Sequence, residues 1–387
     1  MLYCAILCAN HKKKQNKSLE NTNRKRRYET MKMKWAGILV LAAALLTATG
    51  CGKNTGQQEQ TVRLATMTTG FTALMHEANT SGVYSDLGLH VDEQFFDNGP
   101  TINEAIAAGD IDVATIGAMP SITGNIANGT RVVAVLTDDE ESVQIYARND
   151  SDIVKAGKGH INGHGNIYGS ADEWRGKKVV CAKGTSSHYT LLAALATMNL
   201  TESDIELINM EGASGASAFA SGTGDIFVGF DPQWSVFYEN PDEYTCIATC
   251  ADTGKKLIDV VIATDDFCEN HAEELTDLLR GVLQVEKTYE NDQDGYDQVM
   301  YQWQNEYGEC SENVAAYSAQ IKPILSIDEQ LNRFEDKNGQ SPVQQTLLEI
   351  ADFMVENKII EQSDADTLID NKLIDDSFLK QAIKELQ

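Results

Sequence analysis

Short apolar runs that suit β-strands alternate with helix-like segments along most of the chain, and the same order occurs twice. Residues 61–78, TVRLATMTTGFTALMHEA, predict a strand, a Thr/Gly turn and a helix. Residues 177–196, KKVVCAKGTSSHYTLLAALA, repeat this order. In each half a second strand and an alanine-rich helix follow, at 89–96 and 101–109 and at 205–210 and 212–222.

Both halves then reach a similar phrase, GDIDV at 109–113 and GDIFV at 224–228, 115 residues apart. We interpret the glycine as the left-handed end of a helix and the apolar residues as the start of a buried strand. Asp110 and Asp225 are then turn residues rather than catalytic groups. The repeated order strand–helix–strand–helix–strand predicts an α/β protein with two parallel-sheet lobes.

Loops that follow predicted strands are the candidate binding segments. In parallel α/β sheets, ligands bind outside the carboxyl ends of the strands. If the two lobes face each other, these ends border a shared cleft. The candidate loops are MTTGF (67–71), GAMPS (117–121), GTSSH (184–188) and FDPQW (230–234).

The loop GTSSH stands directly before an amphipathic helix. Gly184 allows a tight turn, and Thr185, Ser186 or Ser187 can cap the helix, whose first N–H groups lack partners within it. An oxyanion at this helix end would meet N–H donors, hydroxyls and the positive end of the helix dipole. The alternative is ordinary capping without a ligand. His188 is predicted either as a donor in the cleft or as a first-turn residue packed between loops.

The other loops offer less specific chemistry. Asp231 could accept a hydrogen bond from an amino group of the ligand, and Trp234 or Phe71 could form an aromatic wall. The alternative for Asp231 and Trp234 is a structural turn around Pro232.

The amino-terminal segment is typical of an exported protein. MKMKWAGILVLAAALLTATGCG (31–52) has two lysines, an apolar run and small residues before Cys51, which is the order of a signal peptide. The apolar run is shorter than the ~20 residues that span a bilayer. Residues 48–51, ATGC, resemble a bacterial lipobox with Ala48 in place of the usual leucine. This resemblance implies lipidation of Cys51, and the alternative is cleavage without a lipid.

We therefore expect residues 31–50 to be a lipoprotein signal peptide and residues 51–60 to be a flexible tether. Residues 1–30 are basic and do not fit the residue order of a secretion signal. Because Met31 and Met33 are each followed by a lysine, we expect translation to begin at one of them, with residues 1–30 as an upstream mis-start.

Charge is divided unevenly along the chain. Residues 1–34 hold ten Lys and Arg against two Asp and Glu, so the remainder carries 21 basic and 56 acidic side chains. Such a body repels phosphate backbones and anionic headgroups, which argues against a nucleic-acid partner.

Five cysteines follow Cys51, namely Cys181, Cys246, Cys250, Cys268 and Cys310. An odd number cannot all pair within one chain. Cys246 and Cys250 lie in a predicted strand, where four residues span ~13 Å, beyond the ~7 Å limit for a disulfide. We expect buried free thiols. No His/Cys cluster has zinc spacing, and a metal at His160 and His164 is the less favoured alternative, so no metal or cofactor is expected.

Three segments together resemble a known family. They are SGVYSDLGLHVDEQFFDNGPTINEAIAAGDIDVATIG (81–117), GTSSHYTLLAALATMNL (184–200) and GFDPQW (229–234). In order and spacing they are similar to the nitrate-, taurine- and sulfonate-type substrate-binding proteins of ABC importers, a group that includes binders of the thiamine pyrimidine precursor. The resemblance runs from about residue 61 to the carboxyl end.

The resemblance implies a two-lobed, periplasmic-binding-protein-like fold of type II, with two parallel-core sheets joined by crossing strands near 144–148 and 259–264. Lobe I would hold residues 61–146 and 262–387, and lobe II residues 147–261. The ligand contacts expected from the resemblance and the helix start are Thr68, Thr69, Gly70, Phe71, Met119, Gly184, Thr185, Ser186, Ser187, His188, Asp231 and Trp234. The Gly/His loop at 155–170 departs from the family pattern.

We therefore expect a lipid-anchored receptor on the extracytoplasmic face of a bacterial, Gram-positive membrane. It would capture a small solute and deliver it to a permease with its ATPase, and it would catalyse no reaction. A sulfonate, carboxylate or nitrate-like anion is the first candidate ligand, and a neutral or cationic heterocycle such as a pyrimidine precursor is the second. The alternatives are an enzyme on the same fold and a binding lipoprotein that serves a sensor.

Overall fold

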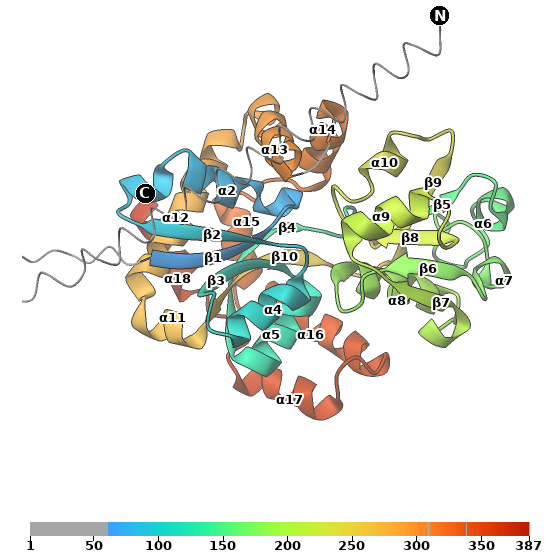
Figure 1. Ribbon diagram of the computed structural model, residues 1–387. Coiled ribbons are helices and arrows are strands. Elements are labelled where there is room, and N and C mark those ends of the chain that lie inside the picture. The colour runs from blue at the N-terminus through green and yellow to red at the C-terminus, as the bar shows by residue number, and fades with distance from the viewer. Residues whose placement is uncertain (1–60, 308–309, 338, 387) are drawn as a thin grey trace, which may run out of the picture. The chain divides into compact units, whose positions relative to one another are not determined.

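In the computed structural model the strands form two five-stranded sheets, and helices pack against them (Figure 1). The structure describes residues 61–386, except 308–309 and 338. The predicted upstream segment, signal peptide, tether and lipidation site therefore lie outside the described residues. The strands are β1 (Thr61–Met67), β2 (His90–Phe96), β3 (Val113–Gly117), β4 (Thr130–Asp138), β5 (Gln144–Arg148), β6 (Lys178–Cys181), β7 (Glu206–Asn209), β8 (Ile226–Gly229), β9 (Tyr244–Thr249) and β10 (Ile258–Thr264).

Helices follow most of the strands and fill the carboxyl-terminal third of the chain. The α-helices are α2 (Ala73–Thr80), α3 (Val83–Asp86), α4 (Gly99–Ala107), α5 (Ala118–Asn128), α6 (Asp152–Ala156), α7 (Ala171–Trp174), α8 (Ser186–Thr197), α9 (Gly212–Ala220), α10 (Ser235–Tyr238), α11 (Asp265–Asn270), α12 (Ala272–Tyr289), α13 (Gln293–Tyr307), α14 (Glu312–Ile321), α15 (Ile327–Phe334), α16 (Pro342–Glu356), α17 (Gln362–Asp370) and α18 (Ser377–Leu386). Three 3₁₀ turns complete the described chain, η1 (Gly70–Thr72), η2 (Glu202–Asp204) and η3 (Ala251–Thr253).

The two sheets share one topology. The first has the order β2-β1-β3-β10-β4 and the second β7-β6-β8-β5-β9. In each, three strands pair in parallel and the remaining two are antiparallel additions. The parallel strands are those of the predicted repeat, so the predicted α/β fold of two parallel-core sheets is confirmed. The central strands β3 and β8 are buried along their whole length, which explains their continuous apolar runs.

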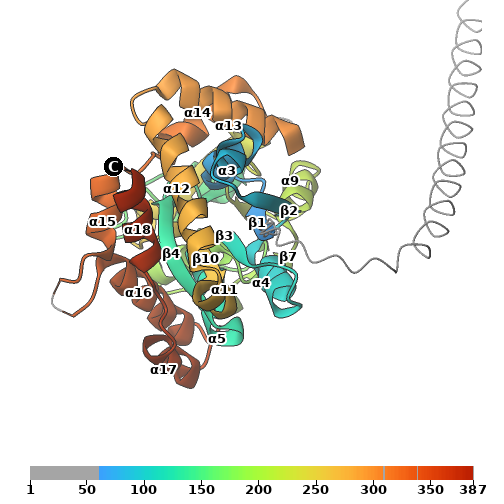
Figure 2. The same ribbon diagram turned by 90° about the vertical axis from the view of Figure 1, so that its left-hand side faces the viewer.

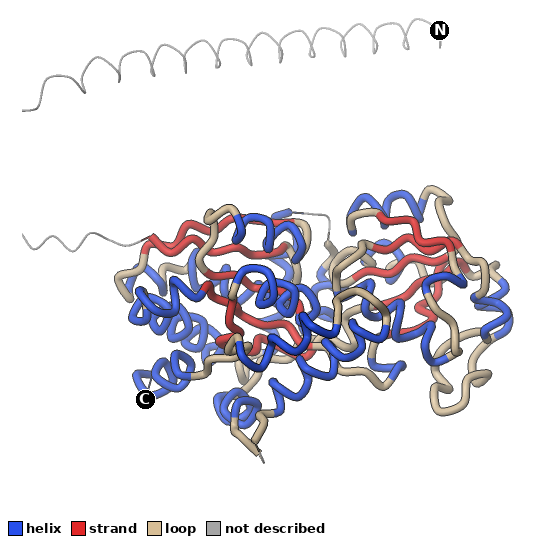
Figure 3. The backbone as a smooth tube through the Cα atoms, turned by 90° about the horizontal axis from the view of Figure 1, so that it is seen from below, coloured by secondary structure: helices blue, strands red, loops and turns tan. Residues whose placement is uncertain are grey.

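Helices cover both faces of each sheet. In the first sheet, α4 and α5 lie on one face and α2 and α12 on the other (Figures 1 and 2). In the second sheet, α8 and α9 lie on opposite faces, and the strands run between layers of helix (Figure 3). We call each sheet with its helices a lobe, and both lobes belong to one compact unit.

The repeat is visible in one detail of the hydrogen bonding. The amide of Arg63 donates to Asp112 Oδ2 at 2.9 Å, and the amide of Lys178 donates to Asp225 Oδ2 at 2.8 Å. Each aspartate amide donates back to the carbonyl of the same strand residue. Asp225 is therefore the structural turn residue that was predicted, and its counterpart in the first lobe is Asp112 rather than Asp110.

The chain passes between the sheets at 139–143 and again at 250–257. The boundaries expected at 146/147 and 261/262 instead fall inside β5 and β10. Each of these strands is paired on both edges within one sheet, so neither can serve as the crossing. Their apolar patterns are those of buried strands, which do not reveal where the chain changes lobe.

All five cysteines of the described chain are free, as predicted. Four of them are buried, and Cys246 in β9 is half-buried. Among the described residues, no helix combines the length and apolar character needed to cross a bilayer.

Candidate functional site

A cavity of about 590 Å³ lies where loops from the carboxyl ends of four strands meet. Thr68 and Thr69 follow β1 and Asp97 follows β2 in the first lobe. Glu211 follows β7 and Phe230 follows β8 in the second lobe. Parallel α/β sheets bind ligands at this position, outside the carboxyl ends of their strands. The cavity is the candidate functional site.

Most of the cavity wall belongs to the second lobe. One side is α9 with the residues before it, and the other is the loop that runs from β8 into α10. The first lobe adds Gln304 from α13. The lining residues are Thr68, Thr69, Asp97, Glu211, Gly212, Ala213, Ser214, Ala216, Ser217, Ala220, Phe230, Pro232, Gln233, Ser235, Val236 and Gln304.

The two lobes are joined beside this cavity by Asn98 and Glu211. The side-chain oxygen of Asn98 caps α4 by accepting from the amide of Thr101 at 3.0 Å. Its amide nitrogen donates to the carboxylate of Glu211. One asparagine thus caps the start of a helix in the first lobe and holds an acidic side chain of the second.

Asp231, a predicted ligand contact, lies behind the cavity wall and is fully buried. Its carboxylate accepts from the Gly70 amide at 2.8 Å, from Gln304 Nε2 at 3.0 Å and from Ser142 Oγ at 3.0 Å. Burial raises the pKa of Asp231, although the nearby ammonium of Lys322 opposes this effect. Asp231 therefore joins the two lobes through these hydrogen bonds. Its side chain is fully buried and does not line the cavity.

Lys322 lies at the centre of a buried charged cluster beside the two crossings. Its ammonium contacts Asp139 in the first crossing, Asp259 Oδ2 at the start of β10 at 2.9 Å and Asp231 Oδ1 at 3.5 Å. Burial would lower the pKa of Lys322, but the three carboxylates hold it well above its usual value. Burial and the neighbouring Asp139 raise the pKa of Asp259. The carboxylates neutralise the lysine, and the cluster joins the first crossing and the loop after β8 to the first lobe.

The predicted aromatic and apolar wall is also internal. Trp234 is fully buried, and its indole N–H donates to the carbonyl of Ser142 at 2.9 Å. The ring of Phe71 lies 5.1 Å from the ammonium of Lys322. Met119 is fully buried at the start of α5. None of these three residues lines the cavity.

The loop GTSSH has the predicted turn but lies against the other lobe. Gly184 has a left-handed φ of +77° and Thr185 is the N-cap residue of α8. The Thr185 hydroxyl donates backwards to the carbonyl of Ala182, so the expected capping bond is absent. Ser186 Oγ lies 2.5 Å from the point where a Cβ on Gly117 would stand. Residues 184–188 are not among those that line the cavity.

His188 is held inside the second lobe. Its Nε2 lies 2.7 Å from a carboxylate oxygen of Glu202, and its Nδ1 lies 3.5 Å from the amide of Gly184. Nδ1 accepts in this arrangement, so the proton on Nε2 is donated to Glu202. Burial lowers the pKa of His188, which favours the neutral ring. Of its two predicted roles, this geometry matches the packed first-turn residue.

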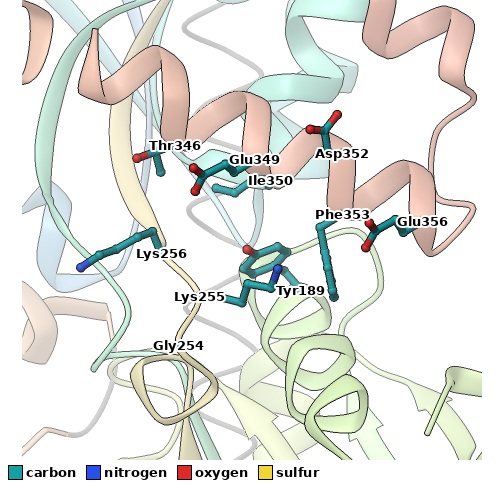
Figure 4. A pocket seen from close by; sticks show the side chains of 10 residues that line it. All are labelled: Tyr189, Gly254, Lys255, Lys256, Thr346, Glu349, Ile350, Asp352, Phe353 and Glu356. Atoms are coloured by element: carbon teal, nitrogen blue, oxygen red, sulfur yellow. The ribbon is translucent and has the colours of Figure 1, made fainter. Parts of the chain in front are cut away.

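A smaller cavity of about 270 Å³ lies where α16 meets α8 and the second crossing (Figure 4). The ring of Phe353 contacts Tyr189 edge-on at 5.1 Å, and the ammonium of Lys255 lies 4.8 Å above Phe353. The acidic side chains of this cavity come from α16 and its two lysines come from the second crossing, and we interpret it as the packing edge of α16 against the second lobe.

The histidines of the 155–170 loop bond to backbone carbonyls. His160 Nε2 lies 2.9 Å from the carbonyl of Ala156, and His164 Nδ1 lies 2.9 Å from that of Asp252. In the part of the chain that the structure describes, no group of three or more His, Cys, Asp or Glu is arranged to hold a metal ion.

Two cavity segments were missed by the sequence reasoning. Asp97 and residues 211–217 follow strands that were correctly predicted, so the rule of strand ends could have found them. Gln304 and Lys322 had no such signal, because helical residues without a motif give no indication of their distant partners.

Comparison with known proteins gives a consistent result. Residues 70–293 match the family described as NMT1/THI5-like. An ABC transporter periplasmic binding protein of Brachyspira hyodysenteriae is 24% identical over 350 residues, which cover 89% of this chain and 97% of that protein. An aliphatic sulfonates-binding protein of Bacillus subtilis is 23% identical over 373 residues, covering 90% and 97%.

Among solved structures, the periplasmic nitrate-binding protein of Synechocystis PCC 6803 superposes with a TM-score of 0.65 at 15% identity. The match covers 85% of this chain and 90% of that one. At this identity the likeness establishes the fold alone. The predicted resemblance to nitrate-, taurine- and sulfonate-type binding proteins is confirmed at the level of the family.

Proposed function

We propose, from the premise that this chain belongs to the NMT1/THI5-like family, that it is the solute-binding subunit of an ABC importer. It captures a small organic solute outside the cytoplasm and delivers it to a permease with its ATPase. The relatives described above are named as binding proteins, which supports binding rather than catalysis.

The observation that carries this proposal is the cavity of about 590 Å³ between the loops of the two lobes. Its volume lies within the range of about 300–1,000 Å³ that small-molecule sites occupy. Of the residues predicted to bind the ligand, Thr68 and Thr69 are the ones we propose as contacts.

Closure of the lobes over the solute fits the contacts beside the cavity. The Asn98–Glu211 bond and the bonds from Gly70 and Gln304 to Asp231 each join one lobe to the other. A solute that touches both walls adds to these contacts and stabilises the closed arrangement. The hydroxyl of Thr69 is buried and has no hydrogen-bond partner among the described residues, so a polar group of the solute would satisfy it.

Attachment to the membrane through a lipid on Cys51 is part of the proposal. The ATGC phrase at 48–51 and the polar tether after it support this attachment. Metabolic labelling with a fatty acid, with and without Cys51→Ser, tests it. Retention of the label by the Cys51→Ser protein would contradict the lipid site.

The binding function is tested by thermal-shift screening of sulfonates, carboxylates, pyrimidines and amines against the purified whole chain. A true ligand at a hundredfold excess over its Kd stabilises by about 2.7 kcal/mol, so a hit is visible as a raised Tm. Ser217 lines the cavity and is exposed on α9, so Ser217→Trp should fill the cavity and abolish the shift. Thr223→Trp, at an exposed position outside the cavity lining, is the matched control. Equal shifts in both variants would exclude the cavity as the site.

A further inference from the structure

We infer that the solute carries a cationic nitrogen, such as an ammonium or amidinium group, and is not recognised through an oxyanion. This inference rests on the proposed function, because it concerns the same cavity, and it names the class of solute that this chain selects.

The charged groups of the cavity wall have one sign. Asp97 stands on the side of the first lobe and Glu211 on the side of the second. No lysine, arginine or histidine is among the residues that line the cavity. Both side chains are exposed at the cavity wall, so they repel a monoanion that no basic lining residue attracts, whereas a cation is attracted from both lobes.

The amino end of α9 is the place in this cavity where an oxyanion would ordinarily bind, because the first N–H groups of a helix are unpaired. In this chain the N-cap residue of α9 is the acidic Glu211, whose side chain makes no capping bond and accepts from Asn98 instead. A negative charge therefore already stands near the positive end of the helix dipole. The side chain of Gln233 covers the next residue: its Nε2 lies 1.9 Å from where a Cβ on Gly212 would stand. An anion therefore meets a carboxylate and an amide side chain before it reaches the backbone donors.

The other candidate anion groups face away from the cavity. The amino end of α8 is closed by the packing of Ser186 against Gly117. Lys322 is 1% exposed and is surrounded by the carboxylates of Asp139, Asp231 and Asp259. Neither group can supply positive potential to a solute without separating contacts that the structure holds closed.

The remaining wall suits an apolar body next to the cationic nitrogen. Phe230, Pro232 and Val236 give an apolar surface in the second lobe. Residues 35–387, with 21 basic and 56 acidic side chains, also produce a field that concentrates cations near the cleft.

The inference is tested with three probes that share one ring: benzylamine as the cation, benzyl alcohol as the neutral analogue and benzenesulfonate as the anion. Isothermal titration and thermal shift on the purified whole chain should rank them in this order, with benzylamine about tenfold tighter than benzyl alcohol and benzenesulfonate without a detectable shift.

Glu211→Gln keeps an acceptor for Asn98 but removes the charge, so it should weaken benzylamine about tenfold and leave benzyl alcohol unchanged. Glu243→Gln, an exposed glutamate of the same lobe outside the cavity lining, is the control and should change neither. A lower salt dependence of benzylamine binding in Glu211→Gln than in the control is expected as well.

Three results would overturn the inference: no binding of benzylamine, binding of benzenesulfonate at least as tight, or equal benzylamine affinity in the two glutamine variants. The Ser217→Trp variant shows whether only the cationic class of solute is wrong or whether the proposed binding function is wrong as well. If benzenesulfonate binds and Ser217→Trp abolishes its binding, the cavity remains the solute site and only the cationic class is wrong. If no solute of the broader screen binds, the proposed function itself fails.

Discussion

The carboxylate of Asp231 accepts a hydrogen bond of 2.8 Å from the amide of Gly70, 161 residues earlier in the chain. This bond joins the loop after β8 to the loop after β1, and the same carboxylate also accepts from Gln304. The neighbouring residues Thr68, Thr69 and Pro232 thereby reach opposite sides of one cavity. A buried carboxylate in one lobe thus organises the candidate site without facing it.

Asp231→Ala removes the acceptor of three buried donors, and we expect the free energy of unfolding to fall by about 3 kcal/mol. Asp231→Asn retains a carbonyl acceptor and should lose less. Urea denaturation measures both, with Asp242→Ala, an exposed aspartate of the second lobe, as the control. A loss in Asp231→Ala no larger than that of the control would show that the network contributes nothing to stability.

Gly117→Ala should keep the lobes apart. The φ of Gly117 is −71°, which alanine adopts freely, but its Cβ would stand 2.5 Å from Ser186 Oγ of the second lobe. We expect a larger radius of gyration by small-angle scattering in the presence of ligand, and about tenfold weaker binding, because closure is hindered.

Adding Ser186→Ala provides the control for this steric effect. It removes the clashing oxygen and leaves the Ser186 Cβ at 3.8 Å from the new methyl group, an ordinary contact. The double variant should recover both the scattering radius and the affinity. A Gly117→Ala protein that closes and binds like the unmodified chain would contradict the lobe contact at this point.

Glu286, buried in α12, should make the protein less stable as the pH rises. Burial raises the pKa of Glu286 to about 8, and its Oε2 has no hydrogen-bond partner among the described residues. Between pH ~4.5 and 8 the folded chain keeps a proton that the unfolded chain has lost, so the free energy of unfolding falls across this window.

Glu286→Gln cannot ionise, and it should be more stable than the unmodified protein at pH 8 by on the order of a few kcal/mol, with little difference near pH 4.5. Guanidinium denaturation across this pH range measures the effect. Glu290→Gln, at an exposed position of the same segment, should follow the unmodified protein. Parallel pH profiles for Glu286→Gln and Glu290→Gln would contradict the assignment.

The thiols should be unreactive in the folded state. Burial raises the pKa of Cys246, Cys250, Cys268 and Cys310 to about 12, and that of Cys181 still further. At pH 8 almost no thiolate is present, so iodoacetamide should label these positions only after denaturation. Peptide mass spectrometry identifies the labelled sites, and rapid labelling of Cys246 in the native protein would be the contradictory result.

The sequence pattern predicted the helices and strands around the site closely. The runs 61–78 and 177–196 became β1, α2, β6 and α8, and Gly109 has the left-handed φ expected at the end of α4. In the second lobe the left-handed glycine at the end of α9 is Gly222, and Gly224 lies two residues further along. These features depend on side-chain periodicity and on glycine geometry within a few residues. Because local interactions decide these features, they can be predicted from the sequence without knowledge of the fold.

The residues that line the cavity were harder to predict from the sequence pattern. Ser186 and Asp231 have the chemistry of ligand contacts, but each meets a partner in the other lobe, Gly117 and Gly70. A hydroxyl that packs against a distant backbone, or a carboxylate that accepts from one, has the same sequence signature as a side chain that binds a ligand. The choice depends on how the lobes close.

The amino-acid pattern alone predicts the twofold order of strands and helices, the family and the free cysteines of the described chain. The folded chain shows in addition that the loops after β1, β2, β7 and β8 share a cavity, while those after β3 and β6 pack against each other. Strand ends follow from the local pattern of side chains, whereas the pairing of loops from separate lobes follows from side-chain volume and burial across the interface between them.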